Sequence, residues 1–125
     1  MFEYYNPNPA ERHTGDCVYR GLTYFLGITW MKAVMDLVLF TANRGLVNFT
    51  YISTVTEYLK QKGFRRCKPE CAMTVAAFIQ RYALPGHAYL IMLEKPKHVT
   101  VVSTEGKILD IGDCSHATIK YFWKN

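Results

Sequence analysis

The sequence predicts an α+β domain, with helices in its first two-thirds and an antiparallel sheet in its last third. Apolar residues recur at helical spacing through residues 14–83. Residues 84–86, Leu-Pro-Gly, mark a change, and residues 87–124 are rich in apolar and β-branched runs of strand length. A Thr-Glu-Gly turn at residues 104–106 separates two of these runs, as expected for a β-hairpin.

The chain has 125 residues and is 50% hydrophobic, which suits a single domain (1–125) with one core. Residues 1–13 are aromatic and polar and contain Pro7 and Pro9. Because proline disfavours helix for itself and for the residue before it, we expect residues 1–13 to form an extended N-terminal arm.

Four helices are expected in the next part of the chain. Their predicted ranges are about 17–26, 30–41, 51–62 and 74–82. Asp16, Thr29 and Thr74 are residue types that cap helix N-termini. Gly27 and Gly63 stand where the first and third helices end.

Four strands are expected after the Leu-Pro-Gly segment, at about 87–93, 98–103, 107–111 and 117–123. In the last strand, one predicted face carries Ile119, Tyr121 and Trp123, and the other carries Lys120, Phe122 and Lys124. If the two middle strands pair around the turn, the numbers of facing residues sum to about 209 or 210. A slip of one residue in this pairing would move the side chains of one strand to the opposite face of the sheet.

The composition argues against several classes of protein. The net charge is +5, but the main basic cluster, residues 60–68, reads as a solvated helix end and loop, and no nucleic-acid-binding motif accompanies it. We therefore expect no nucleic-acid partner. No apolar run has the length of a membrane span, and no export signal is recognisable, so we expect no membrane partner and a cytoplasmic location. The four cysteines are then expected to be thiols.

Cys17 is the first candidate for chemistry. It falls in the first turn of the first predicted helix, after Gly15 and Asp16. Free backbone N–H groups and the helix dipole favour an anion there, which lowers the pKa of a thiol and makes it nucleophilic. A packing cysteine would suit the same position. The catalytic interpretation therefore needs a base and an orienting group from elsewhere in the chain.

His98 and Asp110 supply such a pair. His98 opens one strand of the predicted hairpin and Asp110 lies on the other, so the two would be near neighbours. A carboxylate that orients an imidazole is the base half of a nucleophilic triad. His87 is a second candidate base, and Asp113 and His116 are alternatives for the same roles.

Two other readings compete with this one. Cys67, Cys71, Cys114 and His116 could form a Cys₃His zinc site, but the 114–116 spacing is unusual for zinc, and we expect no metal and no cofactor. The aromatic residues 121–123 could stack bases, but a strand packing its aromatics into the core is the simpler interpretation.

Several motifs resemble the papain-like superfamily. They are Gly-Asp-Cys at 15–17, Lys-His-Val-Thr-Val-Val at 97–102 and Gly-Lys-Ile-Leu-Asp at 106–110. The closest shape is the compact group that includes the NlpC/P60 and transglutaminase-like domains. Asp-Cys-Val-Tyr-Arg at 16–20 and Asp-Ile-Gly-Asp-Cys-Ser at 110–115 also resemble small papain-like proteins of phages and prophages.

The resemblance implies a papain-like fold and a thiol-dependent amide hydrolase with a thioester intermediate, either a small cysteine peptidase or a peptidase-like acyl transferase. Cys17 would be the nucleophile, His98 the general base and Asp110 the orienting residue. The substrate would be a protein or peptide. The alternative is a papain-fold binding protein without strong catalysis, such as a phage protein that engages a host protein in the host cytoplasm.

The resemblance also implies an oxyanion site made by the Cys17 backbone N–H and one upstream donor. Papain-like enzymes often use an upstream Gln, and none precedes Cys17. His13, Arg12 or a backbone group would have to serve, and Asp16 is a further pocket candidate. Val18 and Tyr19 replace the small residues usual in the cell-wall branch, which argues against a peptidoglycan substrate. The oligomeric state is left open.

Overall fold

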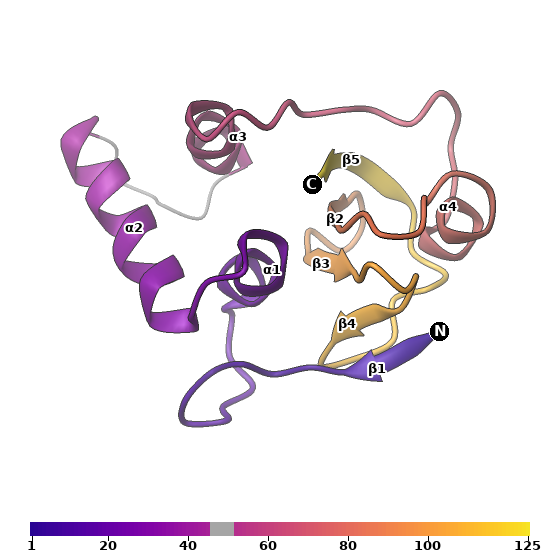
Figure 1. The fold of residues 1–125 in the computed structure, drawn as a ribbon, viewed down its shortest axis with the longest axis horizontal. Helices are drawn as coiled ribbons and strands as arrows, with labels where there is room; N and C mark the ends of the chain where they lie inside the picture. Colours follow the sequence, from indigo (N-terminus) through magenta and orange to yellow (C-terminus); the bar gives the residue numbers. More distant parts are fainter. Residues whose placement is uncertain (46–51) are drawn as a thin grey trace.

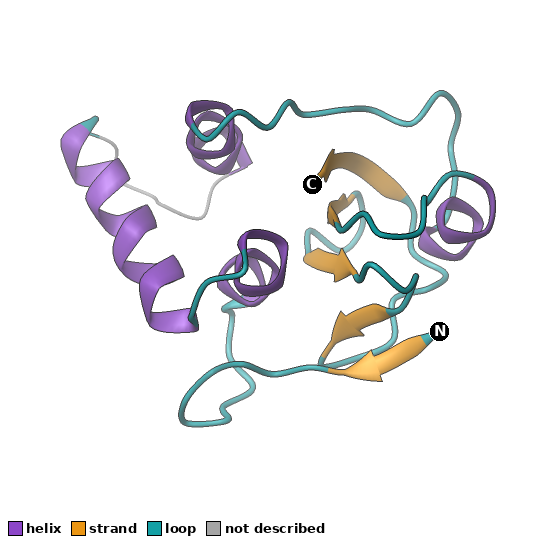
Figure 2. Cartoon of the chain, viewed as in Figure 1, coloured by secondary structure: helices purple, strands orange, loops and turns teal. Residues whose placement is uncertain are grey.

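In the computed structural model, which describes residues 1–45 and 52–125, a five-stranded sheet lies between two helical layers (Figures 1 and 2). The helices are α1 (Cys17–Leu26), α2 (Trp30–Asn43), α3 (Ile52–Gln61) and α4 (Val75–Arg81). The strands are β1 (Phe2–Tyr4), β2 (Tyr89–Leu93), β3 (Val99–Val102), β4 (Ile108–Asp110) and β5 (Ile119–Lys124). Helices α1, α2 and α3 lie on one side of the sheet and α4 on the other (Figure 1). The predicted α+β class is confirmed.

The strand order in the sheet is β1-β4-β3-β2-β5. Strands β2 to β5 pair antiparallel, as predicted. In the β3–β4 hairpin Val101 faces Leu109 and Val102 faces Ile108. This is one of the two registers that the turn predicts, and it brings the end of β4 beside the start of β3.

The prediction of an entirely antiparallel sheet is wrong in one strand. β1, within the predicted arm, runs parallel to β4 at the sheet edge, with Tyr4 opposite Asp110. The Tyr5 N–H also donates to the Asp110 carbonyl oxygen at 2.8 Å. A strand this short has no alternation to detect, and its partner lies at the far end of the chain, so local sequence signals could not reveal it.

Gly21 lets α1 lie directly on the sheet. A Cβ at this position would be 2.6 Å from Leu90 Cδ1 and 3.2 Å from Val99 Cγ1. The first contact is closer than real Cβ atoms make and the second is tighter than most, so a side chain here would have to push the end of the Leu90 side chain aside. The buried side chains of α1 then pack on β2 and β3. As a result, Cys17 at the start of α1 faces the start of β3.

The predicted faces of the last strand need a correction. β5 pairs with β2 in a register that skips Lys120, which makes Lys120 the extra residue of a β-bulge. Tyr121 and Trp123 therefore pack on the α1 side, whereas Ile119 packs on the α4 side. The expectation that these residues share one face is wrong, because alternation assumes regular pairing.

The ends of the elements are close to the predicted ones. Thr29 and Thr74 cap α2 and α4 by accepting hydrogen bonds from Lys32 and Ala77 backbone N–H groups, both at 3.1 Å. Gly27 and Gly63 adopt left-handed conformations with φ of 66° and 93°. α2 extends past residue 41, and each strand is one or two residues shorter than predicted at one end or both. The predicted start of the third helix, residue 51, lies outside the described residues.

Within the described part of the chain, no helix alone has the length and apolarity to cross a membrane. Taken together, α1 and α2 meet those limits, with a bend of 107° between them.

Candidate active site

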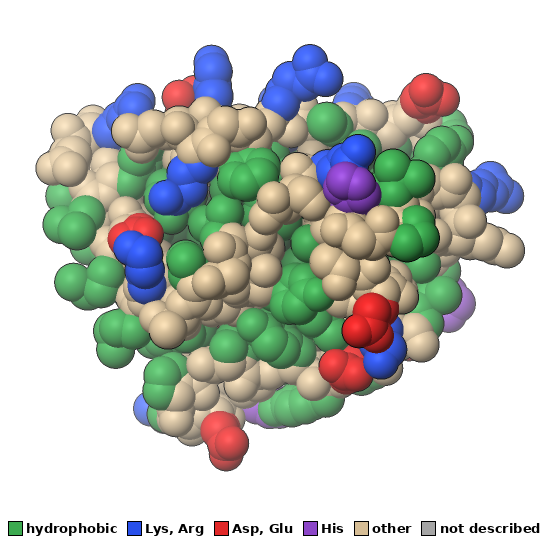
Figure 3. Space-filling model, in the orientation of Figure 1, with side chains coloured by type: hydrophobic (Ala, Val, Ile, Leu, Met, Phe, Trp, Pro, Cys, Tyr) green, Lys and Arg blue, Asp and Glu red, His purple; other side chains and the backbone are tan. Residues whose placement is uncertain are grey.

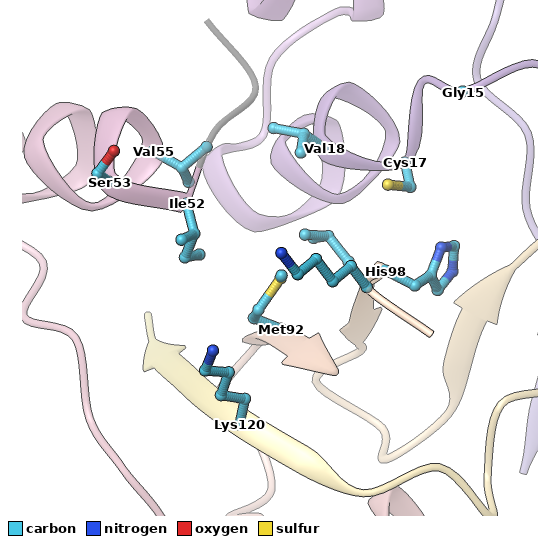
Figure 4. A pocket seen from close by; sticks show the side chains of 11 residues that line it. Gly15, Cys17, Val18, Ile52, Ser53, Val55, Met92, His98 and Lys120 are labelled. Atoms are coloured by element: carbon cyan, nitrogen blue, oxygen red, sulfur yellow. The ribbon is translucent and has the colours of Figure 1, made fainter. Parts of the chain in front are cut away.

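The structure brings Cys17, His98 and Asp110 together. Cys17 opens α1, His98 directly precedes β3 and Asp110 ends β4. Figure 4 shows the Cys17 and His98 side chains near each other at one end of the pocket. The His98 Nε2 and Asp110 Oδ2 atoms are 2.6 Å apart. The interaction of His98 with Cys17 is the second largest cause that raises the pKa of His98, after Asp110. The three candidate residues thus lie together in the order Cys17, His98, Asp110.

The two groups that would react have pKa values displaced in opposite directions. Burial alone would raise the pKa of the Cys17 thiol, but hydrogen bonds from His98 and from the Val99 backbone outweigh it, and the pKa lies below the ordinary 9.0. The hydrogen bonds to Asp110 and Cys17 raise the pKa of His98 from 6.5 to about 9. Both displacements favour a thiolate beside an imidazolium over a neutral thiol and imidazole.

Asp110 is buried, with 2% of its surface exposed. Burial raises the pKa of a carboxyl group, yet the hydrogen bond and charge of His98 hold the pKa of Asp110 below its ordinary value. Its Oδ1 accepts hydrogen bonds from the Ile111 backbone N–H at 2.7 Å and from Arg20 at 3.3 Å. Asp110 is therefore an ionised group with a fixed orientation, as an orienting residue requires.

Arg20 connects the start of α1 to Asp110. Its buried guanidinium pairs with both Asp16 and Asp110, and it also donates to the Thr14 carbonyl oxygen at 3.4 Å. Arg20 has no role among the sequence-based predictions, where it appears only within the 16–20 motif. The four-residue spacing between Asp16 and Arg20 on a helix was the signal that could have revealed the first of these pairs.

Asp16 supports this network and does not contribute to the cleft. It occupies the N-cap position of α1, but its side chain makes no capping hydrogen bond. Instead it pairs with Arg20 and accepts hydrogen bonds from Trp30 Nε1 at 2.9 Å and from Asn8 Nδ2 at 3.4 Å. The predicted side-chain cap is wrong, because these buried donors hold the carboxylate.

Arg12 and His13 are not brought to Cys17. Both are exposed and line a separate hollow with Trp30 and Met31. The His13 Nε2 atom lies 3.0 Å from the hydroxyl oxygen of Tyr4. The upstream side chains expected as oxyanion donors therefore point to a different part of the surface.

The alternative acid and base candidates also lie elsewhere. His87 is in the turn before β2 and does not line the cleft beside Cys17. Asp113 is exposed and accepts a hydrogen bond from the Ser115 backbone N–H at 2.9 Å. His116 is exposed as well. Among the candidates, His98 and Asp110 are the pair that lies with Cys17.

A cleft of about 500 Å³ opens beside Cys17 and His98 (Figure 4). Most of its wall is apolar, and these residues are Val18, Ile52, Val55, Met92 and Val99. Lys97 and Lys120 also line it. The nucleophile is thus accessible from a hollow large enough for part of a peptide.

The four cysteines are free thiols. Cys114 lies 3.9 Å from Asp110 Oδ2, and burial and nearby carboxylates raise its pKa to about 11. Cys17 and Cys114 are both half-buried, yet their pKa values move in opposite directions. Across residues 1–45 and 52–125, no three His, Cys, Asp or Glu side chains are grouped as metal ligands would be.

Comparison of the chain with protein-family models, curated proteins and solved structures found no match. The function is therefore argued from the geometry of the site.

Proposed function

We propose that this protein is a thiol-dependent acyl-transfer enzyme of papain-like type, most simply a small cysteine peptidase. The observation that carries the proposal is the Cys17–His98–Asp110 triad at one end of an open cleft. A lone cysteine at a helix start would be weak support. A thiol with a lowered pKa, beside an imidazole that a buried carboxylate orients, is the arrangement that nucleophilic catalysis requires.

The chemistry would proceed in two steps. The Cys17 thiolate attacks the carbonyl carbon of an amide, and the carbonyl electron pair moves to oxygen. The imidazolium of His98 then gives its proton to the leaving amine as the C–N bond breaks, which leaves a thioester on Cys17. In the second step His98 takes a proton from water or from an acceptor amine, which attacks the thioester and releases the thiolate.

The start of α1 is suited to hold the oxyanion. The Asp16 side chain is turned away and does not cap the helix, so it does not occupy the backbone N–H groups of the first turn. These N–H groups lie at the positive end of the helix dipole, directly beside Cys17. Since neither Arg12 nor His13 lines the cleft, we assign the second donor to the backbone and not to an upstream side chain.

The test is acylation by p-nitrophenyl acetate, followed by mass spectrometry of the intact protein and of its peptides. We expect an acetyl group on Cys17 that water removes slowly and that added glycinamide removes faster. Cys17→Ser should abolish this labelling, and His98→Ala should slow it strongly. If Cys17 acquires no more acetyl than Cys67, Cys71 or Cys114, the enzymatic proposal fails. The papain-fold binding protein, such as a phage protein engaging a host protein, would then be the better account.

A further inference from the structure

The cleft beside Cys17 has an uneven distribution of charge. Apart from Cys17 and His98, the ionisable side chains that line it in the described part of the chain are Lys97 and Lys120. The same lining residues include no carboxylate. Neither lysine forms an ion pair with a described Asp or Glu, although other surface lysines, Lys32 and Lys107, do. The cleft therefore offers two uncompensated cations next to an apolar wall.

The β-bulge in β5 positions one of these cations, Lys120, beside the cleft. The pairing of β5 with β2 skips Lys120, and this bulged residue lies among the cleft-lining side chains. Figure 4 shows its amine directed away from β5, toward Met92 and Ile52. In a regular strand Lys120 would lie on the opposite face from Tyr121, away from α1. Bulges next to active sites commonly re-aim a side chain in this way.

The surroundings of Lys120 reinforce the positive charge. Its ammonium lies 5.6 Å from the centre of the Tyr121 ring, and the guanidinium of Arg66 lies 4.0 Å from the same centre. Figure 3 shows Lys and Arg side chains gathered along the edge formed by α3 and the segment after it. Glu70 and Glu94 border a neighbouring hollow that shares Lys120, but neither pairs with it. An anion approaching the cleft would meet a cationic rim.

We propose that the cleft selects an acidic peptide, whose acyl portion combines an apolar side chain with a carboxylate, and that Lys120 and Lys97 bind this carboxylate. The apolar side chain would pack against Val18, Ile52 and Met92. The inference rests on the proposed function, since it concerns the substrate of the same thiol. It goes further by assigning the substrate's charge and the residues that recognise it.

The test uses two reagents that differ in charge and hardly in shape, acetyl-Glu-Leu chloromethyl ketone and acetyl-Gln-Leu chloromethyl ketone, in which Cys17 displaces chloride and the two residues occupy the acyl side of the cleft. The second-order rate of Cys17 alkylation is measured for each by peptide mapping. We expect the Glu peptide to react about tenfold faster at low salt, because each partly exposed ion pair contributes a factor of a few. The ratio should fall toward one at about 0.5 M salt, where surface charges are screened.

For each variant we compare the ratio of the Glu-peptide rate to the Gln-peptide rate. Because both rates come from the same protein, a change in the reactivity of the Cys17 thiol cancels in this ratio. Lys120→Gln and Lys97→Gln should each lower the ratio by about threefold, and the double variant should bring it close to one. Lys124→Gln is the matched control, because Lys124 is exposed on the same strand and does not line the cleft. It should leave the ratio unchanged.

The result of this charge-selectivity test can be read separately from the test of the proposed function. If Cys17 is not activated at neutral pH, the same ratio can be measured at about pH 9, where an ordinary thiol is ionised. A ratio near one in the parent protein, a preference for the Gln peptide, or an equal loss in Lys124→Gln would overturn the proposed acid selectivity. A ratio of about ten that needs Lys120 and Lys97 supports it, whether or not Cys17 proves catalytic.

Discussion

Asp110→Asn should lower the pKa of His98 by about 1–2 units, because it removes a full negative charge at hydrogen-bond distance. Asparagine keeps the size of the side chain and an acceptor oxygen for Nε2, so the substitution isolates the charge. His98 and Asp110 are 2.6 Å apart, and Asp110 makes the largest contribution to the raised pKa of His98, ahead of Cys17.

The magnitude follows from the raised pKa itself. A rise from 6.5 to about 9 corresponds to about 3 kcal/mol in favour of the imidazolium. The His98 side chain is 26% exposed, so screening by water reduces this to about 2 kcal/mol. If Asp110 supplies the greater part, its neutral replacement should move the titration midpoint of His98 from about 9 to between about 7 and 8.

The assay is an NMR titration of the imidazole Cε1–H signals in protein labelled with ¹³C-histidine, with the His98 signal assigned by its loss in His98→Gln. Asp113→Asn is the matched control, since Asp113 is exposed and bonds the Ser115 N–H. It should leave the His98 midpoint in place. The reasoning is refuted if Asp110→Asn shifts the midpoint by less than about 0.3 units, or if Asp113→Asn shifts it equally.

Three further predictions concern stability and are checked by urea unfolding at pH 7. Arg20→Met should lower the free energy of unfolding by about 3–5 kcal/mol, because it removes the buried guanidinium that pairs with the two buried carboxylates of Asp16 and Asp110. Lys32→Met, which breaks an exposed pair of the same four-residue spacing, should cost less than about 1 kcal/mol, and equal losses would contradict the assigned role of Arg20. Gly21→Ala should cost about 1–2 kcal/mol despite alanine's better helix propensity, since its Cβ would meet Leu90. Gly112→Ala, with open space around it, should be nearly neutral, and a stabilised Gly21→Ala would disprove the close approach of α1. Thr74→Ala should cost about 1 kcal/mol by removing the cap of α4, whereas Thr74→Ser should retain most of it, and equal effects would exclude the cap.

The features that were predicted correctly from the sequence depend on neighbouring residues. Thr29 and Thr74 cap their helices because a cap is made within one turn of chain. The hairpin register follows from the short turn between β3 and β4. That register also predicts that His98 and Asp110 are near neighbours.

The features that were missed depend on contacts between distant parts of the chain. Asp16 is a good N-cap residue by type, but Arg20 and Trp30 hold its side chain. β1 needs β4 as its partner, and the bulge at Lys120 exists only in the pairing with β2. Local periodicity carries no information on such pairings, so the position of Lys120 beside the cleft could not be predicted from the sequence.

The most direct test of the account is the pH dependence of Cys17 alkylation by iodoacetamide, measured by peptide mapping in the parent protein and in His98→Ala. We predict that Cys17 reacts with a midpoint below that of a free thiol, about 8.5, and that His98→Ala removes this advantage. Cys114, whose pKa is raised to about 11, should stay unreactive over the same range. A Cys17 midpoint near about 8.5 or above, or the same reactivity in His98→Ala, would contradict the thiolate–imidazolium pair on which the proposed function depends.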